Sequence, residues 1–249
     1  MATKAIVPQT APSRFRLLAR LADPATPLGA DVGPILVEMV EPLLSLAEAH
    51  GVAPLVLRHL EMRREAETVA ACAPFRSRLG ETDERARLLR KHASIVVARL
   101  RSRRLPAVPV GASVFARRLY SAPSLRPFDD LHLLLPRGVI NAVEHELSDL
   151  GFGIAAYQKG WERLERHWVH ASEPAVSVRL LGDLVSWPRL RRRVSLDYAT
   201  LTGDEGPTAA ERPARLLAVA AIGAAVDGPF ARLSQLVDVV QAARGIRSA

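Results

Sequence analysis

The spacing of apolar residues predicts helices in the first hundred residues of the chain. Apolar side chains recur every three or four positions in the segments 35–50, 54–62 and 82–103, which is the period of an amphipathic helix. Pro42 lies inside the first segment and predicts a kink or a break there. We therefore expect a helical region before any sheet.

The middle of the chain has shorter apolar runs, several of them rich in β-branched residues, which is typical of strands. Glycine and proline residues separate the runs and mark turns. We expect strands at 107–110, 131–136, 151–157, 167–171 and 175–181, with helices at 112–120 and 140–150. The last three strands follow one another closely enough to pair as hairpins.

Helical spacing returns after residue 212, beyond a turn-rich linker. The order of helices, strands and helices predicts an α+β fold, in which a small mixed β-sheet core is flanked by N- and C-terminal helical segments. We divide the chain into a loose N-terminal arm (1–33), a helical region (34–104), an α/β core (105–200) and a linker with C-terminal helices (201–249).

Composition narrows the class of protein further. Of the 249 residues, 49% are hydrophobic and 24% are charged, which suits a globular protein with a sizeable core. No apolar run is long enough to cross a bilayer, and the first residues lack a secretory signal pattern. The single cysteine, Cys72, excludes an intramolecular disulfide. We expect a cytoplasmic protein without a membrane partner.

The net charge of +8 comes mainly from arginine, which is clustered at 99–104, 117–118 and 189–193. Such clusters attract nucleic acid, nucleotide phosphates or an acidic protein. No aromatic residues interleave them, and no nucleic-acid-binding motif accompanies them. This composition favours solvated helix faces, and a nucleic-acid interface is predicted only if the three clusters share one face.

One arrangement of residues carries a specific chemistry. In the sequence VPVGASVFARRLYSAPSLRPFDDLHLLLP, a strand leads through Gly111 into a short helix, and a second strand follows the acid Asp130. A glycine at that point lets the backbone approach a triphosphate closely. Acids at positions i and i+2 of a strand point to the same side and can hold Mg²⁺. This is the layout of a nucleotidyltransferase core.

The same segment resembles the uncharacterised nucleotidyltransferase family of the polymerase-β-like superfamily. The segments 50–60 and 232–240 also resemble the flanks of that family. The residues that fall at the expected spacings are Gly111, Tyr120, Pro123, Arg126, Asp130, Leu133 and Leu134. The resemblance implies Mg²⁺ or Mn²⁺ with a nucleoside triphosphate, and transfer of the nucleotidyl group to an acceptor.

The chain departs from the family at the positions that the resemblance assigns to the chemistry. Val110 stands in place of a lysine before the glycine, and His132 in place of the second aspartate. On the later strand, Ser177 and Arg179 stand where the family has an acid followed by a histidine. A metal site would then depend on Asp130 and His132, a weak pair for Mg²⁺, which prefers oxygen ligands.

Further residues complete the candidate site. Asp129 is expected to project away from Asp130 on the strand, and Asp183 lies beyond the end of the later strand, so each is a reserve metal ligand. Ser113 either touches a phosphate or sits at a helix N-terminus. Arg126 either binds a phosphate or pairs with one of the neighbouring aspartates.

Histidine spacing offers a separate metal hypothesis. His167 and His170 would share one face of a helix, but on the strand predicted here they point to opposite sides. His92 and His145 are expected to face solvent.

Three functional hypotheses follow. The favoured one is a nucleotidyltransferase-like protein that is catalytically impaired and acts by binding a nucleotide or a protein partner, with no metal cofactor if the site is degenerate. The second is an active enzyme that uses Asp130, His132 and a recruited acid. The third is a basic adaptor for nucleic acid, for which the core is only a scaffold.

Overall fold

The computed structural model describes residues 14–28, 30, 32, 35–62, 66–155, 165–185, 188–226 and 231–247. Its elements form a mixed sheet with helices before and after it in the chain, which confirms the α+β prediction. None of the helices in these ranges combines the length and the apolar character that a membrane span requires.

The N-terminal helices pack more of the chain than the sequence predicts. Residues 1–33 were expected to be a loose arm, yet α1 places Leu17, Leu18 and Leu21 in the core; residues 1–13 lie outside the described residues. Pro42 neither ends nor interrupts the second helix. The helices are α1 (Arg14–Leu21), α2 (Val37–Ala49), α3 (Ala53–Met62) and α4 (Ala66–Ser102).

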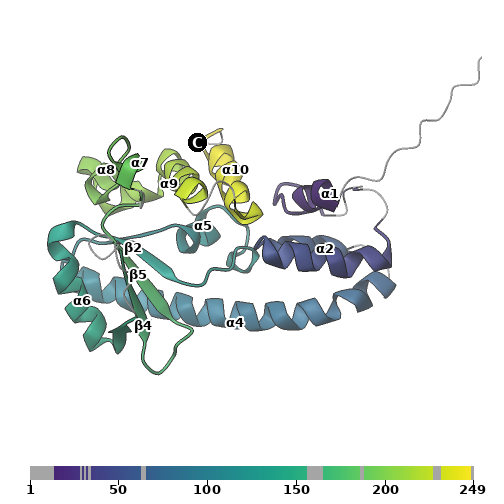
Figure 1. The fold of residues 1–249 in the computed structure, drawn as a ribbon, viewed down its shortest axis with the longest axis horizontal. Coiled ribbons are helices and arrows are strands. Elements are labelled where there is room, and N and C mark those ends of the chain that lie inside the picture. The colour runs from purple at the N-terminus through teal and green to yellow at the C-terminus, as the bar shows by residue number, and fades with distance from the viewer. Residues whose placement is uncertain are drawn as a thin grey trace, which may run out of the picture.

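Helix α4 begins 16 residues before the predicted start and passes through Pro74 and Gly80. Tertiary contacts explain the extension, because Phe75 is buried and Arg78 forms an ion pair with Glu48 of α2. Its 37 residues span about 55 Å. The helix therefore runs along α2 and α3 (Figure 1), and its C-terminal part shares an apolar cluster with the sheet.

The sheet has five strands in the order β1-β2-β5-β4-β3. Strands β2 and β5 pair in parallel, and the other neighbours are antiparallel. The strands are β1 (Val108–Val110), β2 (Leu131–Leu134), β3 (Phe152–Ile154), β4 (Glu165–His170) and β5 (Ser177–Leu181). All five lie within or near the predicted segments, since short β-branched runs between turns form buried strands.

Alternation along the strands separates two faces of the sheet. On β2, Leu131 and Leu133 pack in one core cluster, whereas Leu134 packs in the other. The first face lies against α4 and α6 (Ile140–Asp149). The second face lies towards α5 (Ala112–Arg118), α9 (Pro213–Val226) and α10 (Leu233–Arg247). This second face carries the candidate site.

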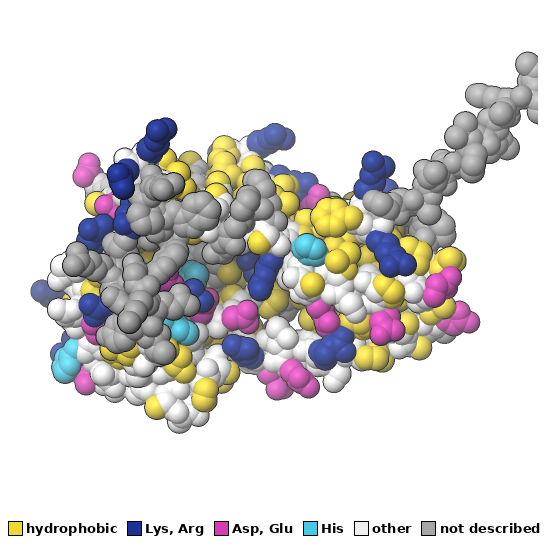
Figure 2. All heavy atoms as spheres, in the orientation of Figure 1, with side chains coloured by type: hydrophobic (Ala, Val, Ile, Leu, Met, Phe, Trp, Pro, Cys, Tyr) yellow, Lys and Arg dark blue, Asp and Glu magenta, His cyan; other side chains and the backbone are white. Residues whose placement is uncertain are grey.

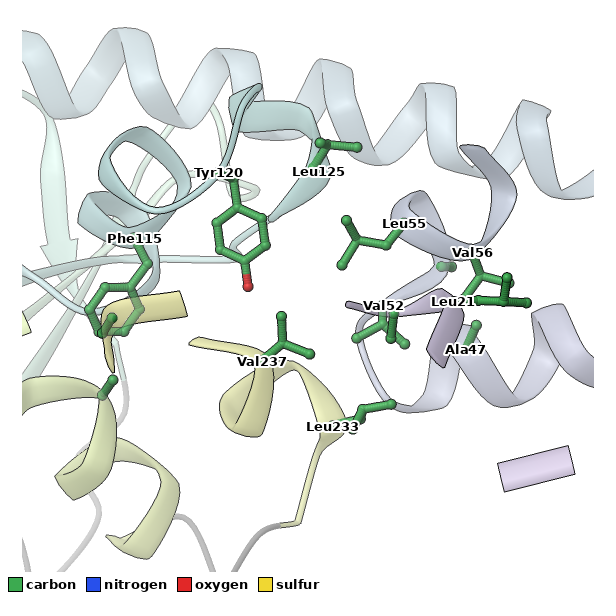
Figure 3. Packing of buried hydrophobic residues seen from close by; sticks show 14 of the residues in the cluster. Leu21, Ala47, Val52, Leu55, Val56, Phe115, Tyr120, Leu125, Leu233 and Val237 are labelled. Carbon is green, nitrogen blue, oxygen red and sulfur yellow. The ribbon is translucent and has the colours of Figure 1, made fainter. Parts of the chain in front are cut away.

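The C-terminal helices pack against both the N-terminal helices and the segment around β1 and α5. Helices α9 and α10 pack side by side after the short elements α7 (Pro188–Arg191) and α8 (Tyr198–Thr202). Leu233 and Val237 of α10 share one apolar cluster with Val52 and Leu55 of the N-terminal region and with Tyr120 (Figure 3). Three-residue and five-residue 3₁₀ turns occupy Gly203–Glu205 and Pro207–Glu211, within the predicted linker.

Candidate functional site

A row of side chains crosses the second face of the sheet. Val110 of β1 pairs with His132 of β2, which pairs with Arg179 of β5, which pairs with His167 of β4. Directly paired residues project to the same side, with their Cβ atoms about 5 Å apart. The four strands therefore bring two imidazoles and one guanidinium together above the sheet.

Asp130 lies just before β2 and contacts two members of the row. One carboxylate oxygen is 3.0 Å from Nε2 of His132, and the other is 2.6 Å from Nε of Arg179. Burial alone would raise the pKa of Asp130, but the two basic neighbours outweigh it and lower the pKa to about 2. Neither nitrogen is aligned for a hydrogen bond with any described residue, so the contacts are electrostatic.

Arg179 also binds a second carboxylate. Its Nη1 atom donates a hydrogen bond of 3.1 Å to Oε1 of Glu165, on the neighbouring strand β4. Burial lowers the pKa of Arg179, but Asp130 and Glu165 more than offset this and raise it. On the other side, burial and then the charge of Arg179 lower the pKa of His167. The guanidinium of Arg179 thus bridges two carboxylates, as a metal ion would.

A pocket of about 350 Å³ lies between this row and the C-terminal helices. Its polar side includes His132, Glu165 and Arg179. Its opposite wall comes from α9, whose lining residues are small or aliphatic: Val219, Ala220, Ile222, Gly223, Ala224 and Val226. The pocket therefore has one polar side and one apolar side.

Gly111 stands between β1 and α5, as the sequence predicts, and its φ angle of +71° is one that glycine adopts without strain. A Cβ atom on this residue would lie 3.4 Å from Nδ1 of His132. Ser113 donates a long, 3.5 Å hydrogen bond to the carbonyl of Val110, at the start of the helix. Gly111 lines the pocket and Ser113 does not.

Arg126 forms a different ion pair from the two predicted for it. It donates hydrogen bonds of 2.8 to 3.1 Å to both carboxylate oxygens of Asp238 on α10, and not to Asp129 or Asp130. The hydroxyl of Tyr120 donates a 2.7 Å hydrogen bond to the same aspartate. We call these three residues the Asp238 clamp. Burial and the negative charge of Asp238 both disfavour the ionised form of Tyr120, so the pKa of its hydroxyl is raised.

Neither reserve acid joins Asp130 in a metal-binding group within the described part of the chain. Asp129 is exposed, and it precedes β2, the strand that was expected to carry it, as Asp130 also does. Asp183 is buried, and its carboxylate accepts hydrogen bonds from the backbone N–H groups of Val185 and Leu196 and from the hydroxyl of Ser195. Its oxygens therefore hold the loop after β5.

The structure also separates His167 from His170. His167 lies in the row, while His170 faces α4, with its ring 4.8 Å from that of His92. Their predicted opposite orientation is confirmed. His92 was expected to face solvent, but it is mostly buried, because it packs against His170 and lies 2.5 Å from Glu173.

Basic and acidic side chains intermingle on the face shown in Figure 2, and no broad basic patch is seen there. Arg99 and Arg103 form ion pairs with Glu146. Arg117 and Arg118 both pair with Glu211. These ion pairs neutralise positive charges that would otherwise bind the phosphates of a nucleic acid.

The residues around Asp130 do not fit the divalent metal that the resemblance implies. Among the described residues, no three His, Cys, Asp or Glu side chains are placed to hold a metal ion. Arg179 lies beside Asp130 instead, and a guanidinium repels a second cation. The oxygen-rich ligand set that Mg²⁺ prefers is not assembled in this part of the chain.

Sequence reasoning missed two acids, Glu165 and Asp238. Glu165 is the first residue of a strand, two positions before His167, so the alternation of the strand predicts that both share a face. Asp238 interrupts the apolar run LVDVV of the last helix, and a buried aspartate there requires a cationic partner.

A comparison with protein families agrees with the resemblance seen in the sequence. A family model described as an uncharacterised nucleotidyltransferase matches residues 38–244. No curated protein matches the chain, and no solved structure does.

Proposed function

Because the chain belongs to the uncharacterised nucleotidyltransferase family, we propose that it is impaired in nucleotidyl transfer and acts by binding a ligand in the pocket beside the sheet. One observation carries the proposal: Arg179 forms ion pairs with both Asp130 and Glu165 beside His132. The protein's own cation thus lies beside Asp130 and His132, the two positions at which the family resemblance places aspartates that hold metal ions.

The loss of the metal site has a large chemical consequence. Metal ions in such reactions neutralise the charge that develops on the phosphates and help to activate the attacking hydroxyl. A guanidinium held by two carboxylates has less charge to offer to a phosphate. Val110 adds an apolar side chain at the position of the family's lysine. Transfer therefore lacks both sources of positive charge.

The test is calorimetric titration of ATP, GTP, CTP and UTP with Mg²⁺ or Mn²⁺. We expect wild type to show no metal-dependent binding. The double variant His132→Asp/Arg179→Asp puts two more carboxylates beside Asp130, because positions 132 and 179 are direct cross-strand partners. We expect this variant to gain metal-dependent binding.

Single variants separate the two substitutions. His132→Asp alone retains Arg179 beside Asp130, so its metal-dependent nucleotide binding is expected to be much weaker than that of the double variant. Metal-dependent binding by wild type that disappears in Asp130→Asn would show a working metal site and would overturn the proposal.

A further inference from the structure

The charges around the pocket determine which ligands it can accept. Two arginines, Arg126 and Arg179, line it together with the acids Glu165, Asp183 and Asp238, and Asp130 contacts Arg179 from beside the pocket. Four carboxylates therefore accompany two guanidiniums, and one further positive charge on His132 would still leave the acids in excess. A family whose ligands carry phosphates would be expected to show the opposite balance.

Neither arginine has its full charge to offer to a polyphosphate. Arg126 is fixed by three hydrogen bonds to Asp238 and one to the carbonyl of Pro127. Arg179 is shared between Asp130 and Glu165. A triphosphate would bring several further negative charges next to carboxylates that are only partly neutralised.

The other properties of the pocket suit a small uncharged molecule. Its volume of about 350 Å³ lies near the lower end of the range for small-molecule sites. Carboxylate, guanidinium and imidazole groups offer both acceptors and donors on one side. On the other side, α9 forms an apolar wall in which the small residues Ala220, Gly223 and Ala224 leave room between aliphatic side chains.

We infer that this pocket binds an uncharged ligand with a flat apolar face and a hydrogen-bonding edge, the class to which nucleosides belong, and that it disfavours phosphates. The inference rests on the proposed binding function and names its ligand class. A base would lie against α9, and its polar edge or a sugar hydroxyl would meet Glu165, Arg179 and His132.

Calorimetry in EDTA tests the inference with a series of ligands. Adenosine, guanosine, cytidine and uridine are compared with their 5′-monophosphates and 5′-triphosphates. We expect at least one nucleoside to bind and its affinity to fall as phosphates are added, by about tenfold or more for the triphosphate. Equal or tighter binding of the triphosphate in EDTA would overturn the inference, as would no binding by any nucleoside.

The outcomes separate this inference from the proposed function. Metal-free binding that favours triphosphates would overturn only the ligand class. Triphosphate binding that requires Mg²⁺ and disappears in Asp130→Asn would overturn the impaired, metal-independent site itself.

Two variants test the placement of the ligand. A Cβ atom at Gly223 would have no heavy atom within 4 Å, so Gly223→Leu adds bulk to the apolar wall without a clash at its Cβ. We expect it to weaken nucleoside binding at least about tenfold. Gly80→Leu is the matched control, because Gly80 is an exposed helix glycine with equally open surroundings, far along α4. Equal effects of the two variants would contradict the placement.

The second variant changes the charge balance. Glu165→Gln removes one negative charge and one of the two carboxylates that pair with Arg179. The affinity for the monophosphate should therefore rise about tenfold relative to the affinity for the nucleoside. Glu144→Gln is the control, because Glu144 pairs with Arg166 on the opposite face of the same sheet. A monophosphate-to-nucleoside ratio that is unchanged in Glu165→Gln would contradict the role of charge.

Discussion

Two arginine–aspartate pairs lie beside the same pocket, and they differ in burial and in geometry. The side chains of Arg126 and Asp238 are 14% and 3% exposed, and their hydrogen bonds involve both carboxylate oxygens. Those of Arg179 and Asp130 are 42% and 19% exposed, and their contact is short but poorly aligned for a hydrogen bond. The shortest N···O distances in the two pairs are nearly equal, at 2.8 Å and 2.6 Å.

The difference separates a structural contact from a site. The Asp238 clamp joins the turn before β2 to the last helix. Its arginine and tyrosine already donate hydrogen bonds within the protein. Arg179 and Asp130 also contact Glu165 and His132, and they face a pocket that solvent reaches. We therefore assign stability to the first pair and ligand selection to the second.

The largest expected effect comes from the clamp. Asp238→Ala leaves the guanidinium of Arg126 buried without its carboxylate, so the free energy of unfolding should fall by about 3 to 5 kcal/mol. Urea denaturation measures the change. Asp129→Asn, at an exposed acid, is the control and should stay within about 0.5 kcal/mol of wild type. Similar losses in both variants would remove the distinction between the pairs.

A smaller effect is expected at Asp130, and it should depend on pH. Its pKa is lowered to about 2 in the folded protein, against 3.8 as its ordinary value. The folded state therefore favours the charged form, and the stabilisation is present above about pH 4 and is lost as pH falls towards 2. At 1.36 kcal/mol per pH unit, it amounts to about 2 kcal/mol.

Urea denaturation of wild type and Asp130→Asn at a series of pH values measures this stabilisation. The difference between the two proteins should be constant near neutral pH and should shrink below about pH 4. A difference that does not change with pH would show that the ion pairs of Asp130 contribute no stability.

The smallest effect concerns the glycine that borders both β1 and the pocket. Gly111→Ala places a side chain at a φ angle of +71° and close to His132, so we expect a loss of about 1 to 2 kcal/mol in the free energy of unfolding. Gly138→Ala is the control, since Gly138 has no positive φ angle and open surroundings. Equal stabilities of the two variants would show that Gly111 is not conformationally required.

Local patterns predicted most of the fold. The strands and the helices around Gly111 and Asp130 follow from runs of a few residues bounded by turns, and the structure has them within a few positions. The predicted start of α4 was wrong. Pro74 and Gly80 are residues that usually break a helix, but packing against α2 and α3 keeps this segment helical. Helix propensity is a weak guide where tertiary contacts decide.

The candidate site was predictable only in part. The motif located Gly111, Asp130 and His132, which are close in sequence. The partner of Arg126, Asp238, lies 112 residues away in the sequence, and Asp129 and Asp130 were nearer candidates. The register of β5 beside β2 puts Arg179 against Asp130, and no local pattern contains that register. Long-range pairing therefore decided the electrostatics of the site.

The most direct test of the central claim is a titration with Mn²⁺ alone, followed by electron paramagnetic resonance of the free ion. If Arg179 takes the place of the metal, wild type and His132→Asp should bind Mn²⁺ weakly, and His132→Asp/Arg179→Asp should bind it at least about tenfold more tightly. Tight binding by wild type that is lost in Asp130→Asn would contradict the claim.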